Sequence, residues 1–405
     1  SGIRPENILL ATFTNKAAGE MKQRVEALGA ARGATVSTFH ALCARLLREF
    51  AREAGLSPNY SIYDRDDQLK LVKQAMERLS LPSDRLRPAS VHAEISRAKN
   101  ELKDPASYGA GELNYFRRAA AEAYVEYEKL LAANHALDFD DLLLRTARLL
   151  RDRPDIRRAL GERYRYILID EYQDTNHAQY LLAHGLAMDH ENICATGDPD
   201  QSIYAWRGAD IRNILEFEQD YPNATVVRLE ENYRSTQPIL AAASRLISHN
   251  AQRKHKELWT RRTGGPSVRV AHLDDEKDEA RYLARRIRAL SEAGTPYSDI
   301  AVFYRINALS RVVEEALLRE TVPYRVARGT EFYNRREIKD VLAYVRLLVN
   351  GADDLSCRRV INTPARGIGG TTVKRLESLA AARGLSLLDA CRMGPEAGLS
   401  AAAAK

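Results

Sequence analysis

The chain has 405 residues, a formal net charge of +6, and 45% hydrophobic and 29% charged residues, which is typical of a soluble globular protein with two to four domains. No apolar run approaches membrane-spanning length and no basic-then-apolar leader begins the chain, so we expect a cytoplasmic protein with no membrane partner. Four scattered cysteines without a C-x-x-C pair argue against a zinc site or a disulfide framework, and the basic charge permits a polyanionic partner without requiring one.

Short apolar runs rich in β-formers recur along the chain, and stretches of helical periodicity separate most of them. The runs cover residues 7–14, 166–171, 192–198, 225–233, 268–273 and 300–305. This alternation predicts an α/β fold of parallel sheets with helices on their faces. Ligands bind such sheets at the carboxyl ends of the strands, and the polar residues cluster there.

The first two predicted strand–helix units share one form. Residues 11–25 and 36–50 each read as a strand, a Thr-Phe dipeptide and a basic amphipathic helix. Hydroxyls and helix N-termini suit a nucleic-acid backbone, and Phe13 and Phe39 could meet bases. As isolated patterns, both phenylalanines are more often core residues.

Residues 56–135 interrupt the alternation. Apolar residues three and four apart predict helices there, without a convincing strand, and Asp64 is a suitable N-cap. We therefore interpret this stretch as a helical insertion.

The stretch "ILIDEYQDTN", residues 167–176, ends a buried strand with Asp170 and Glu171. The first acid suits a magnesium ion held through its water shell, and the second suits deprotonation of an attacking water. An isolated Asp-Glu pair is more often an exposed strand-to-helix junction.

Another predicted strand leads into "GDPDQSIYAWRGAD", residues 197–210. The amide of Gln201 both donates and accepts, which suits the sensing of a terminal phosphate. Tyr204, Trp206 and Arg207 are of the kinds that stack on unpaired bases. The alternative, in which Tyr204 and Trp206 are core residues, fits this polar stretch less well.

Arg234 in "EENYRSTQPIL" suits charge compensation at a transferring phosphate, and Tyr233 suits stacking on a nucleobase. The same residues also read as an ordinary helix N-terminus capped by Ser235 or Thr236, and both readings are compatible.

The chain turns helical again from about residue 334. In "TPARGIGGTTVKRL", residues 363–376, a glycine-rich turn exposes main-chain N–H groups beside Arg366 and Lys374, which suits a phosphate. A plain corner between two helices is the alternative.

Six stretches in this order resemble the UvrD/PcrA/Rep group of superfamily 1 DNA helicases, from residue 1 to about 385. They are "TFTNKAAGEM", "STFHALCARLL", "IDEYQDTN", "GDPDQSIYAWRGAD", "LEENYRS" and "VFYRINALSRVVEEAL". The resemblance implies two RecA-like motor domains with mainly helical insertions, which clamp ATP between them and move along single-stranded DNA from 3′ to 5′. The expected partners are single-stranded DNA, duplex junctions, and repair or replication proteins.

The resemblance also implies a division of the chain. The first motor domain would comprise residues 1–55 and 136–223, the helical insertion 56–135, the second motor domain 224–333, and the start of its own insertion 334–405.

Roles carry over from the resemblance residue by residue. Asp170 would hold Mg²⁺, Glu171 would be the catalytic base, Gln201 and Arg234 would contact the γ-phosphate of ATP, and Tyr233 would stack on adenine. The residues that would line the DNA track are Phe13, Thr38, His40, Tyr204, Trp206, Arg207, Arg305 and Asn307. The duplex-contacting turn would be Arg366, Gly367, Gly369 and Gly370.

The sequence also departs from the family pattern. It contains no G-x-x-x-x-G-K-[ST] phosphate loop, which the family carries just upstream of "TFTNKAA". We therefore expect an internal piece of a longer helicase that is inactive by itself. Two alternatives remain at this stage, a DNA-binding module without turnover and the motor part of a RecB-like helicase–nuclease.

Overall fold

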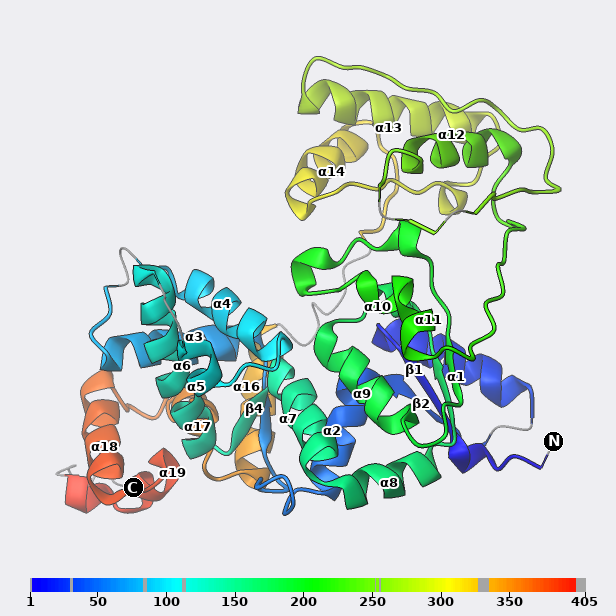
Figure 1. The fold of residues 1–405 in the computed structure, drawn as a ribbon. Coiled ribbons are helices and arrows are strands. Elements are labelled where there is room, and N and C mark those ends of the chain that lie inside the picture. Colours follow the sequence, from blue (N-terminus) through cyan, green and yellow to red (C-terminus); the bar gives the residue numbers. More distant parts are fainter. Residues whose placement is uncertain are drawn as a thin grey trace. The chain divides into compact units, whose positions relative to one another are not determined.

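The computed structural model describes residues 2–29, 32–82, 86–110, 114–251, 253–254, 256–326 and 335–397. The chain forms two compact units (Figure 1). The first unit contains Ser1–Val227, Asn250–His255 and Arg336–Lys405, and the second contains Arg228–His249 and Lys256–Arg335.

A four-stranded parallel sheet forms the centre of the first unit. Its strand order is β2-β1-β5-β6, with β1 Ile8–Thr12, β2 Thr35–Thr38, β5 Tyr166–Ile169 and β6 Ile193–Ala195. Three of the predicted apolar runs therefore form neighbouring strands. The predicted α/β class with parallel strands is confirmed.

Helices pack their apolar sides against this sheet. The helices that follow the sheet strands or lie between them are α1 Asn15–Ala27, α2 Phe39–Glu49, α7 Phe139–Asp152, α8 Pro154–Arg163, α9 His177–Ala187, α10 Arg212–Leu215 and α11 Phe217–Asp220. In α2, the buried Leu42, Cys43, Leu46 and Leu47 recur at helical spacing, and they share one core with Leu9 and Ile167 of the sheet.

In its described residues, the predicted helical insertion contains four helices and one strand. The helices are α3 Arg65–Arg78, α4 Pro88–Asn100, α5 Pro105–Gly109 and α6 Tyr115–Ala133. Asp64 caps α3 by accepting from the N–H of Asp67 at 3.0 Å, as predicted. The expectation of no strand is wrong at β3, Ser61–Tyr63, which pairs in parallel with β4, Ala136–Asp138. Three residues are too few to show the alternation that predicts a strand.

A buried lysine joins the insertion to α7. Lys99 Nζ lies 2.6 Å from Glu128, 2.7 Å from Asp138 and 2.8 Å from Asp141. Together these carboxylates raise the pKa of Lys99 well above its usual value, although burial alone would lower it. Because removing one partner would leave a buried charge uncompensated, this cluster fixes α4 and α6 against α7.

The helices after residue 335 belong to the first unit, and the first two of them contact the insertion. They are α16 Arg336–Val349, α17 Asp354–Val360, α18 Gly370–Arg383 and α19 Leu387–Arg392. The buried carboxylate of Asp353 accepts hydrogen bonds from Ser61 Oγ and Tyr63 Oη, both at 2.7 Å. Arg346 pairs with Asp67 at 2.9 Å. These polar contacts explain why the segment belongs to the first unit.

The second unit is built from α12 Gln237–Ile247, α13 Glu276–Glu292 and α14 Ser310–Arg319. Ala280 and Ala284 of α13 pack with Ala316 and Leu317 of α14. The strands predicted at 225–233, 268–273 and 300–305 do not form ladders in the described residues. They have no regular secondary structure apart from one parallel bridge between Glu231 and Trp259, and Val270 and Phe303 are 93% exposed. Their apolar pattern is that of buried strands, but these side chains are not buried here.

Within the described part of the chain, no helix combines the length and the apolar character needed to cross a membrane.

Candidate functional site

The carboxyl edge of the four-stranded sheet brings together residues that are far apart in the sequence. Because all four strands run in parallel, the residues that follow them emerge at one edge. Phe13 follows β1, Asp170 and Glu171 follow β5, and Thr196 and Gly197 follow β6. The edge was predicted as the ligand-binding side of the sheet.

Asp170 and Glu171 are held firmly by main-chain contacts. The N–H of Asp170 donates to the carbonyl of Ala11 at 2.9 Å, and Asp170 Oδ1 accepts from the N–H of Glu171 at 3.1 Å. Glu171 adopts φ 54° and ψ 44°, a left-handed conformation that side chains rarely adopt. Such strain persists only where neighbours enforce it, and here Tyr172 donates to the carbonyl of Thr196 at 3.0 Å.

Gln173 connects the acidic pair to the segment after β6. Its Nε2 donates to Glu171 Oε2 at 2.7 Å, and its Oε1 accepts from the N–H of Asp198 at 2.9 Å. Asp198 Oδ2 in turn accepts from Gln201 Nε2 at 2.7 Å. A continuous hydrogen-bonded chain therefore runs from Glu171 to Gln201, two of the predicted catalytic residues.

The site has the donor chemistry for a magnesium ion at Asp170. One carboxylate oxygen accepts from Glu171, and no described residue donates to the other. No group of three metal-ligating side chains occurs among the described residues. Mg²⁺ keeps several waters and often binds through one or two carboxylates, so a single half-buried aspartate fits this ion.

Asp174 lies buried in the same loop. Burial, followed by the charge of Glu171, raises the pKa of Asp174 to about 6, while a hydrogen bond from the N–H of Ile203 opposes that rise. A carboxylate with this pKa changes its charge close to neutral pH.

The aromatic residues predicted to contact DNA lie together at this edge. The rings of Phe13 and Tyr204 are 5.0 Å apart, and those of Tyr204 and Trp206 are 6.3 Å apart. The guanidinium of Arg207 lies 5.2 Å from the Tyr204 ring and 4.7 Å from the Trp206 ring. Trp206 is 64% exposed, so the alternative of a core tryptophan is wrong. Exposed and half-buried rings beside a guanidinium suit base stacking.

Thr38 and His40 occupy more enclosed positions. Thr38 caps α2 by accepting from the N–H of Ala41 at 3.3 Å, and its hydroxyl lies 3.5 Å from Asn15 Oδ1. The ring of His40 meets Phe139 edge-on at 5.9 Å, and burial lowers the pKa of His40. Phe39 is a core residue, as its pattern favoured.

The second unit presents Tyr233 and Arg234 on its surface. Tyr233 is 77% exposed, and its hydroxyl donates to Glu231 Oε2 at 2.9 Å, which raises the pKa of Tyr233. Asn232 Oδ1 accepts from the N–H groups of Arg234 and Ser235 at 3.0 and 2.7 Å. Asn232 therefore shapes the turn before α12, whose N-cap residue is Thr236, as predicted, although its side chain makes no capping hydrogen bond. Both arginine and tyrosine are open to a ligand.

The remaining predicted DNA residues of the second unit, Arg305 and Asn307, are exposed at the start of a short 3₁₀ turn, Asn307–Leu309.

In the glycine-rich turn before α18, Arg366 is hydrogen-bonded within the protein, whereas the sequence predicted that it would lie beside a phosphate. Arg366 Nη1 donates to the carbonyl of Val360 at 2.7 Å, and Nη2 donates to Tyr344 Oη at 2.6 Å. The guanidinium is thus occupied at the end of α17, because the last carbonyls of a helix lack partners within it. Gly367, Gly369 and Gly370 remain exposed, with open space around the position of an added Cβ. Asn362 Oδ1 accepts from the N–H groups of Arg366 and Ile368, so main-chain contact with a ligand falls to the N–H groups of the three glycines.

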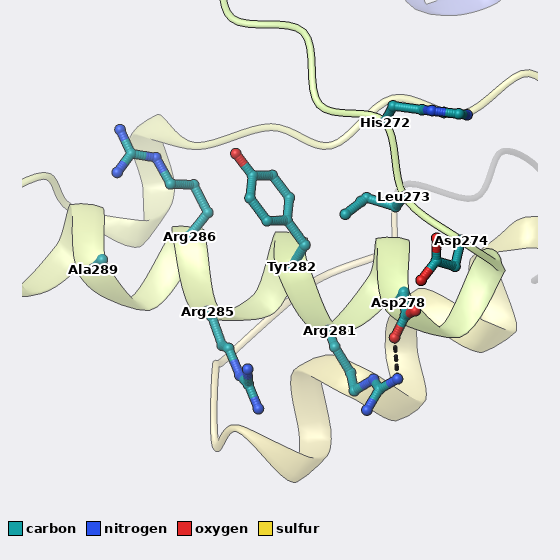
Figure 2. A pocket seen from close by; sticks show the side chains of 9 residues that line it. All are labelled: His272, Leu273, Asp274, Asp278, Arg281, Tyr282, Arg285, Arg286 and Ala289. Carbon is teal, nitrogen blue, oxygen red and sulfur yellow. Dashed lines mark hydrogen bonds and ion pairs between the residues drawn. The ribbon is translucent and has the colours of Figure 1, made fainter.

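A groove of about 510 Å³ runs along α13 in the second unit. Figure 2 shows Arg281, Arg285, Arg286 and Tyr282 projecting from this helix, with His272 on the neighbouring extended segment. Arg281 pairs with Asp278, and Arg285 pairs with Glu320 at 3.5 Å. The groove contains none of the predicted site residues.

Sequence reasoning missed Gln173 and Gly197. A Cβ at Gly197 would lie 2.5 Å from Gln173 Oε1 and 2.8 Å from Ile214 Cδ1, so only glycine leaves room for the amide. The only signal in the sequence is their place beside the predicted acidic and phosphate-sensing motifs.

Two family models match the chain. Residues 1–222 match the model of the UvrD/REP helicase N-terminal domain, and residues 227–395 match that of the UvrD-like helicase C-terminal domain.

Three similar relatives are all described as ATP-dependent DNA helicase PcrA. The protein of Bacillus subtilis (strain 168) is 45% identical over 405 residues, which are 99% of this chain and 55% of the relative. That of Staphylococcus epidermidis (strain ATCC 12228) is 44% identical over 390 residues, 96% of this chain and 54% of the relative. That of Staphylococcus aureus (strain NCTC 8325) is 42% identical over 400 residues, 98% and 55% respectively. The chain spans about half the length of these relatives, and it belongs to the UvrD/REP helicase family.

Proposed function

We propose that these residues form part of an ATP-dependent DNA helicase that moves from 3′ to 5′ along single-stranded DNA, in DNA repair or replication. The observation that carries the proposal is the hydrogen-bonded chain from Glu171 through Gln173 and Asp198 to Gln201, on the edge that also carries Asp170. Family membership and the PcrA relatives support it.

In the proposed reaction, Asp170 would hold a magnesium ion, which offsets the negative charge of the ATP phosphates. The carboxylate of Glu171 accepts the proton of the attacking water. The amide of Gln201 contacts the γ-phosphate and orients the water, while Arg234 of the second unit compensates the charge that develops in the transition state. Tyr233, exposed beside Arg234, stacks on adenine.

The DNA track would include the aromatic group of Phe13, Tyr204, Trp206 and Arg207. Stacking of this kind tolerates any base and so suits a translocating enzyme. Thr38 and His40 in the first unit, and Arg305 and Asn307 in the second, extend the track. The main chain of Gly367–Gly370 would contact the duplex ahead of it.

Hydrolysis also requires a cradle for the β- and γ-phosphates. The 405 residues contain no G-x-x-x-x-G-K-[ST] run, so we infer that they hydrolyse ATP only together with such a loop. We retain the proposed division into motor domains at residues 1–55 with 136–223 and at 224–333, with insertions at 56–135 and from 334.

Strand displacement by the full-length protein tests the proposed function. A duplex with a 3′ single-stranded tail should be unwound in the presence of ATP and magnesium. A duplex with a 5′ tail or a blunt end should not. Unwinding of the 5′-tailed duplex alone would reverse the proposed direction, and unwinding without ATP would contradict the proposal.

A further inference from the structure

We propose that Gln173 is a positioning residue for catalysis, which fixes the carboxylate of Glu171 and links it to the segment bearing Gln201. This inference rests on the proposed function, because it takes Glu171 as the base.

The side chain of Gln173 has one orientation that satisfies its surroundings. It is 1% exposed, and its two amide atoms meet partners of opposite kind. Oε1 receives the N–H of Asp198, and Nε2 donates to the carboxylate of Glu171. A flipped amide would set NH₂ against an N–H group and oxygen against a carboxylate, so two hydrogen bonds would become two repulsions. The amide is therefore locked.

A locked amide matters because Glu171 is itself exposed and its side chain has several torsions. The hydrogen bond to Oε2 restricts those torsions and leaves Oε1 as the oxygen that accepts the proton. A base contributes to catalysis only when it is held within hydrogen-bond reach of the water, and a misplacement of about 1 Å costs about 100-fold in rate.

Gly197 keeps the amide in place from the other side. Its position lies so close to Gln173 Oε1 that an added Cβ would stand 2.5 Å away. Real Cβ atoms do not approach an oxygen so closely, so Gly197→Ala would push the amide out of line without changing its chemistry.

Asp198 is hydrogen-bonded to both Gln173 and Gln201. The main-chain N–H of Asp198 donates to Gln173, and the carboxylate of Asp198 accepts from Gln201 Nε2. Movement of Gln201 toward a γ-phosphate must therefore disturb or relieve the contacts that hold Glu171. This arrangement couples Gln201, which senses the nucleotide, to Glu171, which takes the proton of the attacking water.

Gln173→Glu provides a sharp test, because it keeps the shape and the acceptor for Asp198 but places a second carboxylate against Glu171. In the full-length protein, kcat for DNA-stimulated ATP hydrolysis should fall by about 10- to 100-fold. The KM for ATP and the affinity for single-stranded DNA should stay within about twofold, since neither binding contact is altered.

Gln179→Glu is the matched control. Gln179 is a buried glutamine of the neighbouring α9, and its Oε1 accepts from the N–H of Asn176 at 3.0 Å. The substitution adds the same charge to the same region without facing Glu171, and kcat should stay near that of the wild type.

The double variant Glu171→Gln/Gln173→Glu separates positioning from folding. It reverses the amide and the carboxylate, so the hydrogen bond is restored and any loss of melting temperature in Gln173→Glu should be recovered, while hydrolysis stays absent. Wild-type kcat in Gln173→Glu, with hydrolysis abolished in Glu171→Gln, would overturn this inference alone. Joint losses in kcat, ATP affinity and melting temperature in Gln173→Glu, with a melting temperature that the double variant does not recover, would also overturn it, by showing a purely structural residue. Normal hydrolysis in Glu171→Gln would instead overturn the proposed role of the base.

Discussion

Asn176 Nδ2 donates to Asn100 Oδ1 over 2.5 Å, and this contact ties the end of α4 in the helical insertion to the loop that follows the acidic strand. The amide of Asn100 also donates to Asp140 Oδ1 at 2.9 Å and to the carbonyl of Ser96 at 2.8 Å. The side chain of Asn100 thus bonds to α4, to α7 and to the loop before α9. Gly208, which follows Trp206 and Arg207, lies against both asparagines.

We expect Asn100→Ala to lower the free energy of unfolding by about 1–3 kcal/mol, because it removes the hydrogen bonds of Asn176 Nδ2 and Asp140 Oδ1 in a partly buried site. Chemical denaturation of the purified chain measures this change. Gln23→Ala, on the exposed surface of α1, should change it by no more than about 0.5 kcal/mol. An equal effect of the two substitutions would show that the Asn100 contacts do not contribute to stability.

The raised pKa of Asp174, about 6 in the folded chain, predicts a specific dependence of stability on pH. The folded state binds this proton more tightly than the unfolded chain does. The resulting stabilisation is complete below the ordinary aspartate pKa of 3.8 and is lost as pH rises through about 6. The stability of Asp174→Asn should therefore rise relative to that of the wild type between about pH 4 and 7, from the unfolded pKa to about one unit above the folded pKa.

Denaturation of both chains at several pH values checks this prediction. Asp274→Asn, at an exposed aspartate, shows the effect of neutralising a surface carboxylate. A stability difference between Asp174→Asn and the wild type that is constant across this pH range would contradict the assignment.

Trp206→Ala should weaken binding of single-stranded DNA by about 1–3 kcal/mol and leave the melting temperature unchanged, because the ring is mostly exposed and available to a base. Fluorescence anisotropy with a labelled oligonucleotide measures the affinity. Trp259→Ala, which removes the only other tryptophan, is the control and should bind DNA normally. Normal binding by Trp206→Ala would remove this residue from the DNA track.

Gly369→Asp should reduce affinity for a duplex with a 3′ tail and spare affinity for a bare single strand, since it adds a negative charge where we propose that main-chain N–H groups contact phosphates. Gly369 is the N-cap of α18, where aspartate and asparagine are both favoured, so folding should not suffer. Gly369→Asn has the same size without the charge and should bind both substrates normally. Equal loss on both substrates would point to another contact.

Much of the first unit follows from local patterns in the sequence. The apolar run before Asp170 predicts both β5 and the exposure of the acids at its end, and parallel strands then bring Phe13 to the same edge. Asp64 is found as the cap of α3 because capping depends on residues three positions apart.

Contacts between distant residues are not visible in such patterns. Nothing local indicates that the amide of Gln173 faces Glu171, or that Gly197 leaves space for it, because both depend on how β5 and β6 pair. Arg366 is a second example. Its neighbours in the sequence predict a phosphate-binding turn, but its guanidinium donates to the carbonyl of Val360 at the end of α17. In the second unit, the runs at 268–273 and 300–305 have the composition of strands but form no ladder among the described residues, and composition alone does not supply a pairing strand.

The most direct test of the central claim is DNA-stimulated ATP hydrolysis by the full-length protein and by its Glu171→Gln variant, measured alongside ATP binding. Asp170 is unchanged in the variant, so ATP and magnesium should bind nearly as in the wild type. Hydrolysis should fall by about 10²- to 10⁴-fold, the usual cost of losing a catalytic base. Turnover near the wild-type rate, with ATP bound normally, would contradict the account of this site.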